Sequence, residues 1–462
     1  MPLSLMPVLA RHDIERIHER SLDLLARVGI DYRTPRALQI LEEAGCSVDY
    51  GRTWASVPRD LVEWALQQAP RVVRLYARDP GLDVVLDGRR PHHTTDSQGT
   101  RAIDLETGMR HDSTAEDLRR GLLLADALDK VQIVNMMVAA SDVPAHVRTI
   151  KHFALAYTQT SKHVRTGVLH PGEVPFVVEM AKAAAGSDEF RPIFSAVDCT
   201  ISPLMHDGSM TEACIELARL RVPILIYPMP LAGGTAPVTL AGTILLHNVE
   251  FLSGLVLFQV ANPGTPVIYG AGASQLDMRT GSYGGGADGY GMTLALGDLA
   301  RFYNLPVNLG GLSSSSESLD AQYGHEATAA GLLAVLAGAD EMYSMGLLGD
   351  AQILSLEKMV LDNHLARQIE AMTRPIPMDD EHLQADLIER VGIGGHYLDQ
   401  SETREYTQRE YVPVWPPAGE TMLEIARAEA LEILHKHQPP PLPAGAADRI
   451  EAIVAKADEA LA

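Results

Sequence analysis

Short apolar runs alternate with longer helical patterns over most of the chain, from about residue 92 to residue 371. The first run is HHTTD at 92–96, and the alternation repeats until EMYSMGL at 341–347 and the helical pattern that follows it. The runs are apolar on both faces, which is typical of parallel strands covered by helices. Eight such units in about 280 residues predict a closed (β/α)8 TIM barrel of the α/β class. An open doubly wound sheet with one miscounted unit is the alternative.

The two ends of the chain break this alternation. Before it, the apolar spacing predicts helices and then two strands joined by a Pro-Gly turn, namely residues 12–29, 35–45, 58–69, 72–79 and 82–88. After it, the pattern predicts a loop-rich arm and two further helices that flank the stiff spacer QPPPLPAG. We therefore expect an N-terminal helical and β extension, the barrel, and a C-terminal helical arm packed on the barrel or on a neighbouring subunit. Their expected bounds are 1–90, 91–372 and 373–462.

Composition and charge limit the classes of partner. Of 462 residues, 46% are hydrophobic and 21% are charged, which is ordinary for a folded soluble protein, and the formal net charge is −22. Nucleic acid and anionic membrane surfaces are poor partners for such a chain, because both require clustered Lys and Arg. The charge serves solubility or, in a more specific interpretation, creates a field that favours cationic ligands.

Cysteine usage and the apolar runs bear on the compartment. Cys46, Cys199 and Cys214 lie far apart without CxxC spacing, so neither a disulfide framework nor a zinc knuckle is indicated. The N-terminus has no basic start or small-residue cleavage site, and the longest apolar run, near FLSGLVLFQVA, reads as too short and too interrupted to span a bilayer. We expect a cytoplasmic protein and a homo-oligomer.

Polar side chains follow the predicted strands, where a barrel would gather them at one mouth. They are mainly carboxylates, hydroxyls and tyrosines, without lysine or clustered arginine, which suits a cation better than a phosphate. The candidates for substrate binding are Asp96, Tyr283, Tyr290, Glu317 and Tyr343. Further members of this set are Ser97, Asn135, His170, Asp198, Cys199, Ser202, Tyr227, Met229 and Met345.

Two motif-like stretches and the histidines are weaker signals of function. The glycine-rich GSYGGGADGYG at 281–291 lacks GK[ST] and GxGxxG spacing, so a flexible loop is favoured over nucleotide binding. The histidines show neither HxH nor HExxH spacing, so no catalytic metal is predicted. DNHLAR, starting at Asp362, is similar to a DxHxxG cobalamin motif, but Arg367 stands at the glycine position. Chance is the simpler explanation.

The stretch from Ala300 onward carries a more specific pattern. It contains an R-Y-LP-V strand entry, a GG-x-S loop, D-x-Q-x-x-x-E at residues 320–326, an AG-x-x-x-x-x-x-GLL strand and S-x-E-x-x-x-x-D at 355–362. In these elements, and in an N-terminal LL-x-x-x-G-I helix end, the chain resembles the trimethylamine methyltransferase family of corrinoid-dependent enzymes. The resemblance covers roughly residues 8 to 372.

The resemblance implies a (β/α)8 barrel that demethylates an amine and passes the methyl group to Co(I) on a separate corrinoid protein. Founding members of the family carry pyrrolysine near the strand-seven loop, whereas this chain has ordinary residues at Gly310 to Leu312. It is thus similar to the pyrrolysine-free relatives that act on quaternary amines such as glycine betaine. No cofactor is expected on this chain itself, because the corrinoid would arrive on its partner.

The chemistry of a quaternary amine fits this interpretation, since the departing group is a neutral amine that needs neither metal nor general acid. Tyrosine faces and a carboxylate would bind the cation. The Ser313–Ser316 run with Glu317 would form one wall of the mouth, offering hydroxyls to a substrate carboxylate; alternatively it only caps the next helix. Other expected functions are demethylation of a carnitine-like or proline betaine-like amine, or non-catalytic binding of a quaternary amine.

Overall fold

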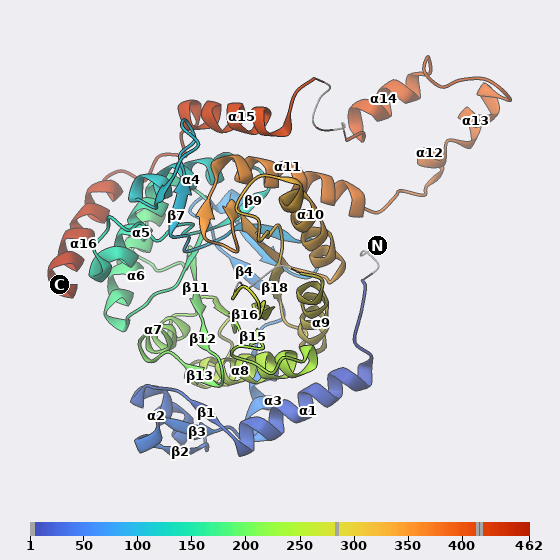
Figure 1. The fold of residues 1–462 in the computed structure, drawn as a ribbon. Coiled ribbons are helices and arrows are strands. Elements are labelled where there is room, and N and C mark those ends of the chain that lie inside the picture. The colour runs from blue at the N-terminus through green and yellow to red at the C-terminus, as the bar shows by residue number, and fades with distance from the viewer. Residues whose placement is uncertain (1–4, 282–285, 413–414, 416–418) are drawn as a thin grey trace.

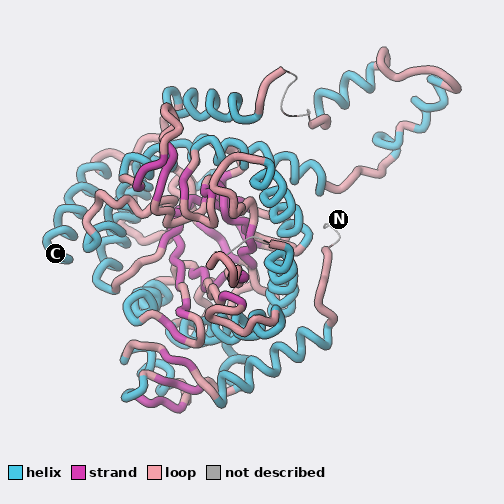
Figure 2. Tube along the Cα trace, in the orientation of Figure 1, coloured by secondary structure: helices cyan, strands magenta, loops and turns pink. Residues whose placement is uncertain are grey.

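The computed structural model describes residues 5–281, 286–412, 415 and 419–462. Its centre is a closed barrel of eight parallel strands surrounded by helices (Figures 1 and 2). In chain order the barrel strands are β6 (His92–Thr95), β9 (Val131–Asn135), β10 (His163–Thr166), β11 (Phe194–Asp198), β14 (Ile224–Ile226), β16 (Val267–Gly270), β18 (Val307–Gly310) and β19 (Glu341–Met345). Each strand pairs with the next, and β19 pairs with β6. The predicted closed barrel is confirmed, and the open sheet is excluded.

One long helix follows each barrel strand, as the sequence pattern predicts. These helices are α4 (Ala115–Ala127), α5 (Arg148–Gln159), α6 (Val174–Ala185), α7 (Gly208–Arg219), α8 (Leu240–Ala261), α9 (Ala287–Tyr303), α10 (Ala321–Leu336) and α11 (Leu356–Thr373). Side-chain caps fix several of their starts: Thr114 forms a capping box with Asp117, and Asp320 and Ser355 accept bonds from backbone N–H groups of the first turn.

Helix α8 is apolar over a longer stretch than the run FLSGLVLFQVA. It spans 22 residues, and within the described part of the chain it is the one helix long and apolar enough to cross a membrane. However, 78% of its apolar window is buried inside the fold. It packs against α1 (Arg11–Arg27), α3 (Arg59–Gln68) and α7, which accounts for its apolar composition as that of a core helix.

The N-terminal segment forms a small unit against the barrel. It adds α2 (Pro35–Glu43) and the short strands β1 (Ile30–Asp31), β2 (Ser47–Asp49) and β3 (Trp54–Ser56). These strands join β12 (Thr200–Ile201) and β13 (Met205–His206), which come from the loop after β11, in one five-stranded sheet. The predicted helices are confirmed; β1 to β3 were not predicted, because two or three residues carry no readable alternation.

The predicted hairpin of β4 (Val73–Leu75) and β5 (Val84–Leu86) is also present. Its apolar side chains pack against Ile133, Leu225 and Ile268 of the barrel interior. The hairpin therefore closes the amino-terminal end of the barrel, and any site that opens from the interior must face the carboxyl-terminal end.

The C-terminal segment divides into an arm and two docked helices. Helices α12 (Asp380–Leu383), α13 (Ala385–Val391) and α14 (Ser401–Arg409) lie away from the barrel (Figure 1). Helix α15 (Met422–Lys436) packs on α11 and α4, and α16 (Ala446–Leu461) packs on α6 and α5. Both docked helices were predicted, and they add a second layer over one side of the barrel.

Candidate active site

The mouth at the carboxyl-terminal end of the barrel is shaped by the loops that follow β18 and β19. The backbone N–H groups of Gly349 and Asp350 donate to the carbonyl oxygens of Ser316 and Ser314, at 2.9 and 3.1 Å. Ser344, Asp350 and Ala351 have φ values of 88°, 52° and 68°, which side chains rarely adopt. Such strain persists only where surrounding contacts fix it, and it is common near functional sites.

Two tyrosines meet at this end of the barrel interior. Tyr227 follows β14 and Tyr343 lies on β19, and their ring centroids are 5.7 Å apart at an interplanar angle of 83°. Glycines end the two intervening strands. A Cβ on Gly270 would lie 2.5 Å from Tyr227 Cδ2, and one on Gly310 would point toward the Tyr343 hydroxyl at 3.6 Å. The absence of side chains at these glycines therefore leaves room for the tyrosine rings.

Asp96 directly follows β6 and lies close enough to Tyr227 to influence its pKa. Its carboxylate accepts a hydrogen bond from the Ser97 backbone N–H at 2.8 Å, and its own backbone N–H donates to the Met345 carbonyl at 3.0 Å. Burial raises the pKa of Asp96 to about 6, although the side chain retains partial access to solvent. A desolvated carboxylate that would be stabilised by a positive charge is thus present at the mouth.

A second carboxyl with a raised pKa, Asp350, was missed by the sequence analysis. Burial and the nearby charges of Glu326 and Asp96 raise the pKa of Asp350 to about 7. Nothing in the local sequence marks it, because its position depends on the positive φ of the loop after β19. Asp96, Asp350 and Glu326 together make this end of the barrel strongly acidic.

The hydroxyl groups of the serine run bind other residues of the chain, so they are not free for a substrate carboxylate as one of the two interpretations expected. Ser314 Oγ donates to Glu326 Oε2 at 2.8 Å, and Ser315 Oγ lies 3.0 Å from Glu326 Oε1. Ser316 Oγ lies 3.0 Å from both the Ser318 carbonyl and Asp320 Oδ2. The interpretation that this run offers hydroxyls to a substrate is wrong for these three serines, which instead join the β18 loop to the start of α10.

Glu317, another predicted substrate-binding residue, turns toward a different element. Its carboxylate pairs with Arg110 on β8 (Arg110–Asp112), and its side chain is 62% exposed. Its charge is therefore already paired directly with a guanidinium, whereas Asp96 is influenced by the nearby charge of Lys358. Together β7 (Arg101–Ile103), β8, β20 (Leu347–Leu348) and β21 (Ile353–Leu354) form a small sheet that brings the first and last loops of the mouth together.

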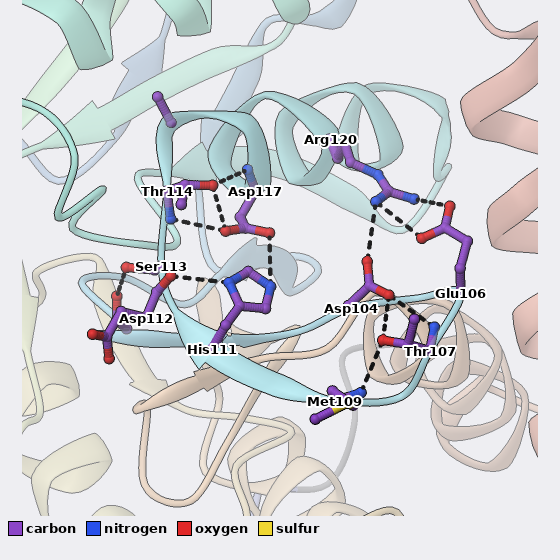
Figure 3. A network of polar contacts seen from close by, with 12 residues as sticks. Asp104, Glu106, Thr107, Met109, His111, Asp112, Ser113, Thr114, Asp117 and Arg120 are labelled. Atoms are coloured by element: carbon purple, nitrogen blue, oxygen red, sulfur yellow. Dashed lines mark hydrogen bonds and ion pairs between the residues drawn. The ribbon is translucent and has the colours of Figure 1, made fainter.

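The β7–β8 hairpin was not predicted, and it is held by the polar network of Figure 3. Asp104 accepts from the Thr107 hydroxyl at 2.6 Å, which tightens the turn. Arg120 of α4 reaches the Glu106 carboxylate at 2.8 Å. These contacts anchor the hairpin to the helix that follows it, so that Arg110 can reach across to Glu317.

The remaining predicted substrate-binding residues are two tyrosines. Tyr290 lies in the first turn of α9, and burial together with the nearby charge of Glu326 raises its pKa. This places it beside the acidic group. Tyr283 lies outside the described residues.

Several other polar groups named at strand ends have structural partners. Asp198 contacts the Thr211 hydroxyl at 3.2 Å and His206 at 3.3 Å. His170 caps a short helical turn by accepting from the Gly172 N–H. Asn135 donates to the Thr94 hydroxyl at 3.2 Å. These contacts explain the residue types without a substrate.

A buried lysine underneath the mouth was also missed. Lys358 Nζ donates to the carbonyl oxygens of Leu312 and Ser344, at 2.9 and 3.0 Å, and to Asp362 Oδ2 at 2.7 Å. The three donors of the ammonium are thus satisfied. Asp362 also accepts from the Tyr323 hydroxyl at 2.8 Å. This network fixes the carboxyl ends of β18 and β19, including the strained Ser344.

A buried ion pair lies inside the barrel between strands β10 and β19. Arg165 binds Glu341 through two hydrogen bonds of 2.7 Å each, and both side chains are almost wholly buried. Ser195 accepts from Arg165 Nε at 2.9 Å, and Asn308 Nδ2 donates to Glu341 at 2.9 Å. Strands β10, β11, β18 and β19, which carry these four residues, are thereby cross-linked through polar contacts in the interior.

The arrangement is that of a (β/α)8-barrel protein with buried carboxyl groups and a tyrosine pair at the carboxyl-terminal end, which is where enzymes of this fold place their active sites. Within the described ranges, no group of three or more His, Cys, Asp or Glu is arranged to hold a metal ion. The chain belongs to the trimethylamine methyltransferase family: the family described as "Trimethylamine methyltransferase (MTTB)" matches residues 2–462.

Named relatives agree with this assignment. The trimethylamine methyltransferase MttB of Desulfitobacterium hafniense is 33% identical, with 97% of this chain and 93% of that protein covered. The Methanosarcina barkeri MttB is 31% identical, with 97% and 94% covered. The glycine betaine methyltransferase of D. hafniense is 29% identical, with 97% and 96% covered. Among solved structures, the M. barkeri monomethylamine methyltransferase MtmB gives a TM-score of 0.49 at 12% identity, with 97% and 91% covered.

Proposed function

We propose that this protein transfers a methyl group from a quaternary amine, similar to glycine betaine, to the Co(I) of a separate corrinoid protein. The observation that carries the proposal is the grouping of Asp96 with the Tyr227–Tyr343 pair at the mouth. Aromatic faces and a desolvated carboxylate are the groups that bind a quaternary ammonium ion. Family membership supplies the reaction class, since the named relatives are methyltransferases.

Gly310, which ends β18, and Gly311, which follows it, support a quaternary substrate over trimethylamine. A side chain on Gly310 would point at the Tyr343 hydroxyl, and a Cβ on Gly311 would lie 2.4 Å from the Tyr343 carbonyl oxygen. This is the region where the founding members carry pyrrolysine. Glycine at position 310 leaves the space beside Tyr343 to a bulkier ligand, such as an ammonium ion that carries a carboxymethyl group.

The residues at the mouth bind and orient the substrate and need not move a proton. When the C–N bond of a quaternary amine breaks, its electrons remain on nitrogen and a neutral tertiary amine leaves. A corrinoid bound by its carrier would supply the nucleophile that accepts the methyl group. The tyrosine rings would hold one methyl group toward the opening, and the Asp96 charge would balance the ammonium. Because the substrate's positive charge disappears during transfer, very tight binding of the cation would slow the step.

The DNHLAR stretch supports the view that the corrinoid is carried by another protein. Asp362 is used by Lys358 and Tyr323. His364 Nε2 lies 2.8 Å from Glu429 Oε2, and its ring stacks on Trp415 with centroids 4.3 Å apart. Asp362 and His364, the two residues that match the motif, therefore serve the packing of α11 and the segment around α15.

Methyl transfer with a reduced corrinoid protein tests the proposal. The purified chain is mixed with glycine betaine, trimethylamine, carnitine or proline betaine, and cobalt methylation is followed by absorbance while demethylated products are identified by mass spectrometry. We expect dimethylglycine from glycine betaine. Turnover of trimethylamine alone would contradict the quaternary assignment. Saturable betaine binding without turnover, with a corrinoid protein that accepts methyl groups from another enzyme, would identify a non-catalytic binder.

A further inference from the structure

A cavity of about 630 Å³ opens at the amino-terminal end of the barrel, at the opposite end from the mouth. It lies between the β4–β5 hairpin, the first residues of β6 and β9, and the C-terminal ends of α4 and α11. Its volume is in the range of small-molecule sites. The proposed methyl transfer does not use it.

The carboxylates that line this cavity are already paired. Glu370 forms an ion pair with Lys130 at the rim. The others bind groups of the surrounding structure: Asp83 binds Arg74 and the Ala77 N–H, Asp126 binds His437 and Ser161, and Asp129 binds Arg367. No carboxylate of the lining is therefore left to attract a cation.

The cations of the lining have a different environment. Arg90 makes no ion pair or hydrogen bond through its side chain with any residue that the structure describes, whereas its neighbour Arg89 pairs with Asp87. Arg374 donates to the backbone carbonyl of Glu410, and buried Lys162 donates to the carbonyls of Ala125 and Leu128. Arg90 and Arg374 thus face the cavity without a carboxylate partner, whereas Asp126 and Asp129 lie near the Lys162 ammonium, in a chain whose formal net charge is −22.

Two buried histidines add unpartnered ring nitrogens. His92 and His93 are 3% and 6% exposed and line the cavity. Among the described residues, His92 Nε2 and His93 Nδ1 have no hydrogen-bond partner. Burial, together with Arg90 for His92 and Lys130 for His93, lowers the pKa of each ring, so both are neutral at pH 7. In neutral His92 the other ring nitrogen donates to the Val85 backbone, so Nε2 is an acceptor and would need a protonated ligand oxygen. The Nδ1 of neutral His93 can carry the ring proton and donate to an anion. A buried polar group without a partner costs free energy, which such a contact could recover.

The remaining wall is mostly apolar, with Gln132 and Thr373 as polar members. Its apolar surface is formed by Leu82, Val84, Val131, Val335, Ala366 and Ile369. A purely inorganic anion would leave this surface in contact with water. An organic anion would bury its chain there while its charged head meets the arginines.

We propose that this cavity is a binding site for a small organic anion, a carboxylate or phosphate ester with an apolar body of several carbons. The head group would bind at Arg90 and Arg374, within reach of the histidine edge. Because Arg374 follows α11 and Arg90 precedes β6, such a ligand would connect the end of the last barrel helix to the start of the first barrel strand. It would also stabilise the folded state, as any ligand specific for that state does.

Isothermal titration calorimetry of the full chain tests the proposed anion site with three probes that share a six-carbon chain, namely hexanoate, hexyl phosphate and hexan-1-ol. We expect each anion to bind at one site, at least tenfold more tightly than the alcohol. The order of the two anions identifies the preferred head group. Arg90→Gln and Arg374→Gln should each weaken anion binding about tenfold. Arg27→Gln removes the same charge from the exposed surface of α1 and serves as the matched control, expected to change affinity less than twofold.

Four results would overturn the proposal. They are the absence of saturable anion binding, equal binding of alcohol and anions, binding unchanged in both Arg90→Gln and Arg374→Gln, or closure of the cavity by a second copy, seen as a dimer in sedimentation that either substitution dissociates. Circular dichroism of each variant checks that it is folded. Betaine binding at the mouth is measured separately, so failure of either site leaves the other interpretable.

Discussion

Tyr227, directly after β14, and Tyr343 on β19 lie edge to face inside the barrel, although these two strands do not pair with each other. Strands β16 and β18 separate them around the barrel, and both end in glycine. The pair is therefore a product of barrel closure, since no local pattern in the sequence brings these two positions together.

Replacement of Tyr343 tests whether the aromatic pair binds the substrate. Tyr343→Leu should raise the KM or Kd for glycine betaine about twofold to thirtyfold, because a cation–π contact is worth about 0.5–2 kcal/mol. Tyr343→Phe keeps the ring and should stay within about threefold of the wild type. The measurement is calorimetric titration with steady-state kinetics. Equal losses in both variants would show that the hydroxyl, rather than the ring, is important.

The affinity for a quaternary ammonium should depend on pH through Asp96. Because burial raises the pKa of Asp96 to about 6, lowering the pH through 6 neutralises the carboxylate and should weaken binding. Asp96→Asn should abolish this dependence and weaken binding about tenfold at pH 8. Glu317→Gln is the matched control, expected to change affinity less than threefold because Arg110 already pairs with Glu317. If Glu317→Gln weakens binding more than Asp96→Asn does, Glu317 is the carboxylate that binds the substrate.

The raised pKa values at the mouth also predict a stability profile. The folded chain keeps Asp96 and Asp350 protonated up to about pH 6 and 7, whereas the unfolded chain releases these protons near pH 4. The folded state thus binds more protons in this window, and its free energy of unfolding falls as pH rises from 4 to 7. Asp350→Asn should reduce that fall, measured by urea unfolding at pH 4.5 and 8. A variant with the wild-type slope would contradict the buried position of Asp350.

The sequence was sufficient for the barrel but insufficient for much of the site. Eight helices with apolar faces and eight apolar runs follow local periodicity, which can be read one segment at a time. Asp96 directly follows β6 and Tyr343 lies on β19, so counting strands along the sequence was enough to select both as candidates. Lys358 and Asp350 could not, because the role of each depends on loops whose positive φ angles bring distant backbone together. The serine run shows the opposite error, since its hydroxyls serve Glu326 and Asp320.

Breaking the buried Lys358–Asp362 pair should lower the free energy of unfolding far more than breaking an exposed ion pair does. Lys358→Met leaves a buried carboxylate and two backbone carbonyls without their donor, and breaking such a pair costs about 3–5 kcal/mol. The double variant Lys358→Met/Asp362→Leu removes both charges and should be less destabilised than the sum of the two single variants. Urea unfolding of the four proteins gives the coupling energy. Additive losses would show that the two residues act independently.

Gly270 tests the close packing beneath Tyr227. A Cβ at this position would lie 2.5 Å from Tyr227 Cδ2 and 2.6 Å from the Ile226 carbonyl oxygen, and the backbone atom cannot move away cheaply. Gly270→Ala should therefore destabilise the protein by about 1–3 kcal/mol and weaken betaine binding through displacement of Tyr227. Gly324→Ala is the matched control, because an added Cβ meets nothing within 4 Å on the exposed surface of α10. It should stabilise the helix by about 0.5–1 kcal/mol and leave binding unchanged. If Gly270→Ala keeps wild-type stability and affinity, Tyr227 is not held where the barrel geometry places it.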